Sequence, residues 1–277
     1  MMAAMPSPAP PTITSVANPR LKAAMALRDR GERDRTGLTL VDGARELRRA
    51  LDAGVTVVEA FVCESLLAGA DARATLDRLQ AGGPAIQPVS ESAFARLAFG
   101  ERAEGLVAVV RIPNLRLEGL RLPADPLIVV VESVEKPGNL GAILRSADGA
   151  GADAVIAASP RTDLFNPNAI RASAGTIFTV ALAAATTAET IEWLRARQVR
   201  IIAARVEAAG DYVAAELTGP LALVVGAEAE GLSDAWSAEG IDAVRIPMLG
   251  IGDSLNVSVS AAILLYEARR QRTAMRS

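Results

Sequence analysis

The stretch AVRIPMLGIGDSLNVS, which spans residues 243–258, decides the fold of the second half of this 277-residue chain. Its apolar start at 243–246 predicts a strand that ends at Pro247. Glycines and small polar residues follow, and the pattern from Val257 to Arg269 predicts a helix. Open α/β sheets bind their ligands where a strand ends and a helix begins. The stretch therefore predicts a ligand site at this corner.

Strands and helices alternate through the rest of the second half. The run LIVVV at 127–131 is apolar throughout, which is typical of a strand covered by helices on both faces. Further strands are predicted at 154–158, 178–182, 200–204 and 221–225, and further helices at 140–150 and 190–197. This order predicts an α/β domain built on a parallel sheet.

The first half is predicted to form a smaller α/β domain. Its expected helices are 19–30, 44–53, 71–80 and 91–97, and its expected strands are 38–41, 55–62, 85–89 and 106–110. Prolines then bracket a polar stretch without periodicity, which is typical of an interdomain linker. The expected organisation is a proline-rich disordered tail at 1–11, a first domain at 12–111, a linker at 112–126 and a second domain at 127–277.

The composition excludes several kinds of chemistry. The chain has no histidine, which removes Ser-His-Asp hydrolysis, histidine acid–base catalysis and most zinc or iron sites, so no metal is expected. The single cysteine, Cys63, follows Phe61 and Val62, which predicts a buried strand position and not a catalytic thiol. The first residues resemble no signal peptide, and no apolar run reaches about 18 residues. A cytoplasmic protein is expected.

Positive charge is concentrated near the start of the chain. The net charge is −3, but residues 18–50 hold nine basic and five acidic side chains, which leaves −7 for the remainder. Eight of the nine are arginines, the residue suited to phosphate recognition, although pairs such as Arg28–Glu32 and Arg30–Asp34 also fit a solvated helix. The candidate RNA-binding residues are Arg20, Lys22, Arg28, Arg30, Arg33 and Arg35.

Three corners after strands carry glycines and polar residues. At the first, Asn139 can cap the following helix and Arg145 projects from its early part. At the second, Glu228 follows LALVV and can orient a sugar hydroxyl, an amine or an arginine. The third holds Ser254, which can cap a helix, and Asn256. Each corner alone also fits an ordinary capped helix or turn, but three in one sheet indicate a site.

One further glycine pattern points to nothing. GAGADA at 149–154 matches a loose dinucleotide fingerprint, but it follows a helix and precedes a strand, the reverse of the required context. A nucleotide-dependent oxidoreductase therefore lacks support.

The three corners resemble the motifs of a known family. NxGxxxR at 139–145, GxExxGLS at 226–233, and IPM at 246–248 with SLNVS at 254–258 are similar to the three motifs of the SpoU (TrmH-type) RNA ribose 2'-O-methyltransferases. RASAG at 171–175 also resembles a family segment. The runs at 13–22 and 40–43 resemble the family's accessory substrate-binding domain. Asp253 and Ser260 stand where close relatives often have Glu and Ala.

The resemblance implies a fold and a site. It implies a deep trefoil knot in the C-terminal domain, S-adenosylmethionine bound in the knot, an RNA-binding N-terminal domain, and a homodimer through the knotted domain with the site near the subunit interface. By motif position, the cofactor-binding residues are Gly226, Ile246, Met248 and Leu255. The catalytic surround is Asn139, Arg145, Glu228, Ser254 and Asn256.

The expected reaction is methyl transfer to a ribose 2'-hydroxyl of RNA. Ribosomal RNA is the preferred substrate, because such accessory domains resemble RNA-binding ribosomal proteins, and tRNA is the closest alternative. A non-catalytic RNA-binding member of the same fold is a further alternative. Arg145 is expected either to act as the base or to hold the target phosphate and polarise the hydroxyl. The second role suits an arginine better, since its pKa in solution exceeds about 12.

Overall fold

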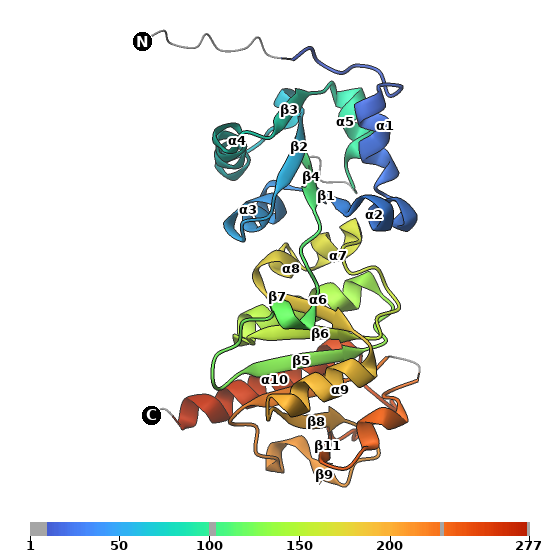
Figure 1. Cartoon of the computed structure of the whole chain (residues 1–277), viewed down its shortest axis with the longest axis vertical. Helices are drawn as coiled ribbons and strands as arrows, with labels where there is room; N and C mark the ends of the chain where they lie inside the picture. Colours follow the sequence, from blue (N-terminus) through green and yellow to red (C-terminus); the bar gives the residue numbers. More distant parts are fainter. Residues whose placement is uncertain (1–9, 100–103, 228–229, 276–277) are drawn as a thin grey trace. The chain divides into compact units, whose positions relative to one another are not determined.

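The computed structural model describes residues 10–99, 104–227 and 230–275, so residues 1–9 of the tail expected at 1–11 lie outside the described part. The chain divides into two compact units, one ending at Ile112 and one beginning at Pro113. Figure 1 shows a sheet with helices in each unit.

The first unit contains a four-stranded sheet in the order β1-β4-β2-β3. Strand β4 runs antiparallel to both β1 and β2, while β3 is parallel to β2. Its strands are β1 (Leu38–Asp42), β2 (Val57–Val62), β3 (Ala85–Pro88) and β4 (Leu106–Arg111). Its helices are α1 (Pro19–Ala26), α2 (Arg30–Thr36), α3 (Ala44–Asp52), α4 (Ala70–Gly82) and α5 (Glu91–Leu97), with a 3-10 turn η1 (Glu64–Leu66). Cys63 is buried in the core of this unit, as predicted, but it follows the end of β2 at Val62 and does not occupy the predicted strand position.

The single helix expected at 19–30 is two helices. Helix α1 ends at Ala26, and Asp29 begins α2 by accepting a hydrogen bond from the Glu32 backbone at 3.4 Å. A side-chain acceptor at this position satisfies an amide that has no partner within the helix, so the aspartate favours a new start. The turn brings Arg33 inward, where it is 1% exposed.

The second unit contains a seven-stranded sheet in the order β7-β6-β5-β10-β8-β11-β9. All of its strand pairs are parallel, which confirms the predicted parallel α/β architecture. Its strands are β5 (Leu127–Glu132), β6 (Ala154–Ala158), β7 (Ala181–Ala185), β8 (Arg200–Ala204), β9 (Gly210–Asp211), β10 (Leu221–Val225) and β11 (Ile241–Arg245). The central strands β5, β6 and β10 are buried along their whole length, and α6 and α9 both contact β6, which agrees with their continuous apolar sequences.

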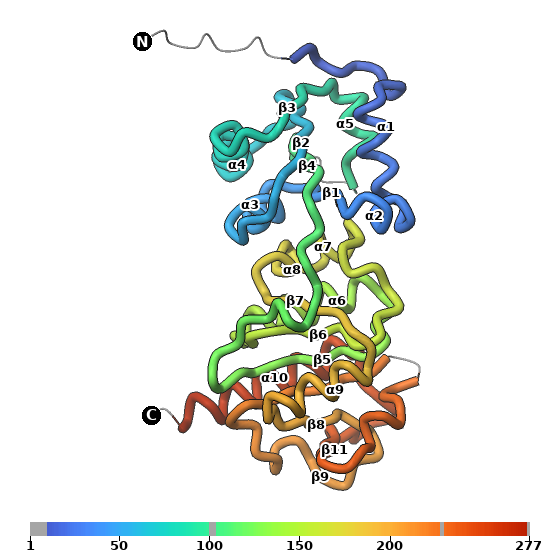
Figure 2. Tube along the Cα trace, in the orientation of Figure 1, coloured from blue at the N-terminus to red at the C-terminus, as the bar shows by residue number. Residues whose placement is uncertain are grey.

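Helices α6 and α10 pack against each other in this unit. The chain leaves β11, near one edge of the sheet, and returns to form α10 (Figure 2). The helices of the unit are α6 (Pro137–Ala150), α7 (Pro167–Ala172), α8 (Thr176–Thr179), α9 (Thr187–Ala196) and α10 (Val257–Ala274). Short 3-10 turns occur at η2 (Leu117–Gly119), η3 (Tyr212–Ala214) and η4 (Asp234–Ser237).

The strand predicted at 178–182 is placed differently. Phe178 lies in α8, and β7 begins only at Ala181. Phe178 is nevertheless buried, and a short apolar run that is buried on both sides has the same appearance in a strand and in a helical turn. Burial was therefore predictable here, but the type of element was not.

Candidate active site

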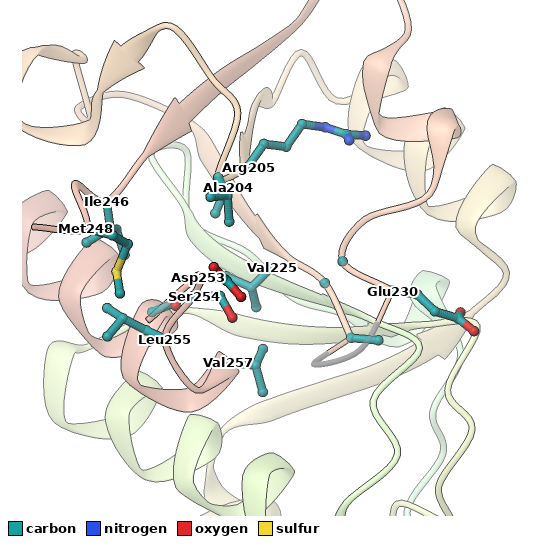
Figure 3. A pocket seen from close by; sticks show the side chains of 15 residues that line it. Ala204, Arg205, Val225, Glu230, Ile246, Met248, Asp253, Ser254, Leu255 and Val257 are labelled. Carbon is teal, nitrogen blue, oxygen red and sulfur yellow. The ribbon is translucent and has the colours of Figure 1, made fainter. Parts of the chain in front are cut away.

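A pocket of about 390 Å³ lies where β8, β10 and β11 end and α10 begins (Figure 3). This volume falls in the range of small-molecule sites, roughly 300–1,000 Å³. The pocket is lined by Ala204, Arg205, Val206, Val225, Gly226, Ala227, Glu230, Gly231, Ile246, Met248, Asp253, Ser254, Leu255, Val257 and Ser260. It lies entirely in the second unit, at the corner that the sequence indicated.

All four residues predicted to bind the cofactor line this pocket. Ile246, Met248 and Leu255 lie on one side of it and supply an apolar wall (Figure 3). Gly226 has a steric role, because a Cβ there would lie 2.4 Å from the backbone carbon and oxygen of Gly231. Only glycine therefore allows the two backbone segments to pass at this distance.

Asn139 and Asn256, which are 117 residues apart, form a hydrogen bond beside the pocket. The Asn256 Nδ2 donates to the Asn139 Oδ1 at 3.2 Å. Asn139 lines a small neighbouring cavity that shares Gly226 and Val257 with the main pocket. The first and third corners of the sequence therefore meet through their asparagines, and Ser254 lies in the pocket wall.

Two predicted helix caps belong to other residues. Helix α6 begins at Pro137 with Lys136 as its N-cap, so Asn139 lies within the first turn. Helix α10 is capped by Asn256, whose Oδ1 accepts hydrogen bonds from the Ser258 backbone at 2.9 Å and its hydroxyl at 2.6 Å. Proline at the first helical position explains the earlier start of α6, since its fixed φ favours that place.

Of the remaining two catalytic candidates, only Arg145 lies within the described residues. Arg145 is exposed on α6, does not line the pocket, and has no hydrogen-bond or ion-pair partner among the described residues. Glu228 lies outside the described residues. The structure therefore gathers Asn139, Ser254 and Asn256 and leaves Arg145 free toward solvent.

The candidate RNA-binding residues of the first unit fall into groups. Lys22 is exposed and has no ion pair among the described residues. Arg28 donates to the backbone oxygens of Arg96 and Ala98 at 2.7 and 3.0 Å, and its guanidinium lies over the Phe99 ring.

Arg20, Arg30 and Arg35 are exposed but take part in ion pairs. Arg20 contacts Glu59 at 3.3 Å, Arg30 contacts Asp34 at 3.5 Å as predicted from the i,i+4 spacing, and Arg35 contacts Glu32. Glu32 therefore pairs with Arg35 and not with Arg28, the predicted partner. The Arg30–Asp34 pair, exposed on both sides, is weak, so a phosphate can replace Asp34 as the partner of Arg30.

Arg33 differs from the prediction. Its guanidinium is buried and donates to the Leu27 backbone oxygen at 2.6 Å, which links α2 to the end of α1. The structure gives Arg33 a structural role in place of the predicted contact with RNA, because a buried guanidinium offers no surface to a phosphate.

Several pocket residues were not singled out from the sequence, among them Ala204, Arg205 and Val225. Each lies at or directly after the carboxyl end of a strand, β8 or β10. The predicted parallel order is the signal that could have found them, since adjacent parallel strands end at the same edge of the sheet.

An ion-pair network joins three loops at this edge. Arg161 contacts Glu135 at 2.7 Å and Glu230, which lines the pocket, at 2.8 Å. The hydrogen bonds from Arg161 to these two carboxylates raise the pKa of the guanidinium above its ordinary value. These contacts connect the loops after β5, β6 and β10 at the surface.

Within the described residues, no group of three or more acidic, cysteine or histidine side chains is placed to hold a metal ion. No helix among these residues is both long and apolar enough to cross a membrane.

A parallel sheet with a pocket at its carboxyl edge defines an α/β protein that binds a small molecule where strands end. The chain belongs to the SpoU rRNA methylase family, whose model matches residues 126–266. The MRM3-like substrate binding domain matches residues 18–108. These matches confirm the family inferred from the three motifs.

Relatives and solved structures agree with this assignment. The 23S rRNA (guanosine-2'-O-)-methyltransferase RlmB of Vibrio parahaemolyticus is 36% identical over 205 residues, covering 72% of this chain and 83% of that protein. The 23S rRNA (uridine(2479)-2'-O)-methyltransferase of Streptomyces viridochromogenes is 32% identical over 281 residues, covering 98% and 96%. The structure of an AdoMet-bound rRNA methyltransferase from Sinorhizobium meliloti is 29% identical with a TM-score of 0.85, covering 94% and 97%.

Proposed function

We propose that this protein transfers a methyl group from S-adenosylmethionine to a ribose 2'-hydroxyl of ribosomal RNA. The observation that carries the proposal is the convergence of Gly226, Ile246, Met248 and Leu255 on one pocket, with the Asn139–Asn256 pair at its side. Relatives with this architecture are named as ribose methyltransferases of 23S rRNA.

The pocket fits S-adenosylmethionine by its lining. Ile246, Met248 and Leu255 would offer their apolar wall to the adenine, and the backbone at Gly226 and Gly231 lines the pocket without a side chain. The cofactor supplies the methyl group on a sulfonium that is also its own leaving group. The protein therefore has to align the hydroxyl with the methyl and to accept one proton.

The proposed catalytic roles are based on which candidate side chains are free to contact RNA and which lie at the pocket. Arg145, which is exposed and free of a partner among the described residues, would hold the phosphate next to the target ribose and polarise the 2'-hydroxyl. Ser254, Asn256 and Glu228 would fix the ribose and carry the proton away. A base role for Arg145 is the alternative, and both roles require this residue.

Ribosomal RNA is preferred over tRNA as the substrate. The first unit matches a substrate-binding domain, and relatives at 72% and 98% coverage of this chain act on 23S rRNA by name. Lys22 and Arg30 supply exposed positive charge on this unit, suited to phosphate contacts without base readout. With ribosomal RNA as the substrate, we expect the protein to act in the cytoplasm.

A homodimer through the second unit is part of this proposal. Val259 and Tyr266 are 45% and 54% exposed and lie seven residues apart, hence on one face of α10. A second subunit that packs on this face of α10 would cover both apolar side chains. A second subunit here would also account for Arg145, which does not line the pocket of its own chain.

Light scattering of the purified protein tests the dimer. We expect twice the mass of one chain for the wild type and a shift toward the monomer for the double variant Val259→Glu, Tyr266→Glu. A wild-type mass of one chain at micromolar concentration would refute the dimer and leave the cofactor site unaffected.

The deep trefoil knot implied by the family motifs is also proposed for the second unit. The return of the chain from β11 to α10, which packs against α6, supports this proposal. Pulling the two ends of this unit in an optical trap tests it. A knotted chain gains less length on unfolding than its residue count allows, and a full gain would refute the knot.

The reaction is tested with methyl-labelled S-adenosylmethionine and separate pools of unmodified ribosomal RNA and tRNA. Digestion should yield a labelled 2'-O-methyl nucleoside from the ribosomal pool. Label from tRNA alone would reverse the substrate preference, and label in a base would refute the ribose assignment. Cofactor binding without any transfer would favour the non-catalytic alternative.

Arg145→Ala is the matched test of the catalytic arrangement. We expect turnover to fall at least about a hundredfold with cofactor affinity retained, because Arg145 does not line the pocket. Arg145→Lys keeps the charge but loses the planar fork, so it should restore only part of the turnover. Near-normal turnover of Arg145→Ala would refute both proposed roles.

A further inference from the structure

The loop after β10, residues 226–233, forms one wall of the pocket. Gly226, Ala227, Glu230 and Gly231 all line it. The loop is closed by a hydrogen bond from the Gly231 backbone amide to the Ala227 oxygen at 3.0 Å, and it ends at Ser233. The shape of the proposed cofactor site therefore depends on what holds this loop against the sheet.

The register of the sheet places a charged residue on each side of the loop. In the parallel pairing, Val225 lies opposite Val131 of β5, so Glu132 is the next residue on that side. Val224 lies opposite Ala203 of β8, so Arg205 occupies the corresponding level on the other side. The two neighbours of β10 thus supply opposite charges at the point where the loop begins.

Both charged residues converge on Ser233. Glu132 accepts hydrogen bonds from the Ser233 backbone amide and from its hydroxyl, each at 2.8 Å. Arg205 donates to the Ser233 backbone oxygen at 2.8 Å. All three polar groups of one serine are therefore held by side chains from the strands on either side.

Glu132 is well suited to this task because it is held in turn. It is 3% exposed and also accepts a hydrogen bond from the Thr187 hydroxyl at 2.7 Å. Burial raises the pKa of Glu132, but the hydrogen bonds from Ser233 and Thr187 outweigh burial and bring it below the ordinary value. The carboxylate is thus kept ionised, with both oxygens occupied.

Arg205 faces the loop and not the centre of the pocket. Figure 3 shows its side chain extending away from Ile246, Met248 and Leu255. It also contacts Glu207 at 3.2 Å. This direction distinguishes Arg205 from a residue that would bind the cofactor through its guanidinium.

We propose that Glu132 and Arg205 are positioning residues that hold Ser233, and through it the 226–233 loop, in the shape that receives the cofactor. The proposal rests on the proposed function, since it assigns the loop to S-adenosylmethionine. It adds two residues that lie outside the three motifs and act through the loop.

The test compares Ser233→Ala, which removes one donor, with Ser233→Thr, which keeps the hydroxyl, in the full-length protein. Glu132→Gln removes the negative charge of the carboxylate that accepts hydrogen bonds from the Ser233 amide and hydroxyl. Glu189→Gln is the matched control, because Glu189 accepts the same kinds of hydrogen bond from the Thr186 amide and hydroxyl but contacts no part of the loop. Circular dichroism confirms that each variant is folded.

Hydrogen exchange of the cofactor-free proteins measures how often the backbone amides of the loop open to solvent. We expect faster exchange in peptides covering 226–237 for Glu132→Gln and Ser233→Ala, and wild-type exchange there for Ser233→Thr and Glu189→Gln. Unchanged exchange in Glu132→Gln and Ser233→Ala would overturn the proposal, whether or not the protein binds S-adenosylmethionine.

Calorimetric titration measures how these changes affect the affinity for S-adenosylmethionine. We expect the Kd to rise about tenfold for Glu132→Gln and Ser233→Ala, which corresponds to the loss of one charge-assisted hydrogen bond. Arg205→Gln should raise it similarly, while Ser233→Thr and Glu189→Gln should bind as the wild type does. A looser loop with an unchanged Kd would overturn the positioning role and leave the proposed function standing. A wild type that binds no cofactor would overturn the proposed function as well.

Discussion

Gly226 is the residue at which a single atom matters most. A Cβ there would meet the Gly231 carbon and oxygen at 2.4 Å, and both are backbone atoms that cannot rotate away. We expect Gly226→Ala to displace the 226–233 loop, at a cost of about 1–3 kcal/mol typical of overpacking, and to weaken binding of S-adenosylmethionine at least about tenfold. Calorimetric titration measures this change.

The control is Gly250→Ala, in the loop before α10, where a Cβ would meet nothing within 4 Å. Its Kd should stay within about twofold of the wild type, since surface substitutions of this kind change little. Equal affinity of the Gly226→Ala variant and the wild type would show that the two segments can separate without harm to the site.

Glu132 also makes stability depend on pH. Its pKa in the folded protein lies below the ordinary 4.5, because hydrogen bonds to the carboxylate outweigh burial. A depressed pKa stabilises the fold above the unfolded value, and this contribution is lost as the pH falls through the folded value. Glu132→Gln should therefore cost about 2 kcal/mol near pH 7 and less below about pH 4.

Urea unfolding at the two pH values measures this difference. The gap between wild type and Glu132→Gln should narrow as the pH falls, because the protonated wild type loses the same charge that the variant lacks. If the free energies of unfolding of the wild type and Glu132→Gln differ equally at both pH values, Glu132 contributes through its shape and not through its charge.

Among whole elements, α10 shows how one side chain can serve both fold and site. Asn256 caps the helix through the Ser258 amide at 2.9 Å and donates to Asn139 at 3.2 Å. Asn256→Ser keeps a capping oxygen but loses the amide donor. We expect stability within about 0.5 kcal/mol of the wild type and a turnover lowered at least about tenfold.

Asn256→Ala separates the two roles further, because it loses the cap as well. We expect it to cost about 1 kcal/mol of stability, as removal of an N-cap does, with turnover as low as in Asn256→Ser. Thermal unfolding and labelled methyl transfer measure the two effects. Wild-type turnover in both variants would refute a catalytic role for the Asn139–Asn256 pair.

At the element scale, periodicity predicted most of the sheet and missed details that depend on distant contacts. The apolar runs at 127–131 and 221–225 form the central strands β5 and β10. A strand covered on both faces is apolar at every position, so its sequence shows a continuous apolar run. The two-residue strand β9 has no such signal. Arg33 and Phe178 were misplaced because a local sequence shows neither the turn at Asp29 nor the packing around α8.

At the scale of the molecule, the sequence predicted which residues of the motifs would come together in one pocket. The cofactor candidates at 226, 246, 248 and 255 line one pocket because their strands end at the same edge of a parallel sheet. Glu132 and Arg205 escaped notice because their importance comes from register, which sets Val225 opposite Val131 and Val224 opposite Ala203. Register across a sheet is a property of the assembled fold and not of any one segment.

The division of charge between the two units leads to the last prediction. Residues 18–50 carry +4 within a chain of net charge −3, so binding of RNA should rest on that segment and should weaken with salt. We expect the double variant Lys22→Glu, Arg30→Glu to bind ribosomal RNA at least about tenfold more weakly near physiological salt. Its binding constant should also fall less steeply with salt concentration, by the amount that corresponds to the loss of roughly two phosphate contacts. The double variant Arg73→Glu, Arg78→Glu, on α4 of the same unit, is the matched control: it changes the charge by the same amount at two exposed arginines that pair with Glu64 and Asp52, and it should leave RNA affinity within about twofold. S-adenosylmethionine affinity should be unchanged in all of these variants, because the pocket lies in the second unit. Equal loss of RNA binding in the two double variants would show that total charge, and not the 18–50 segment, attracts the RNA.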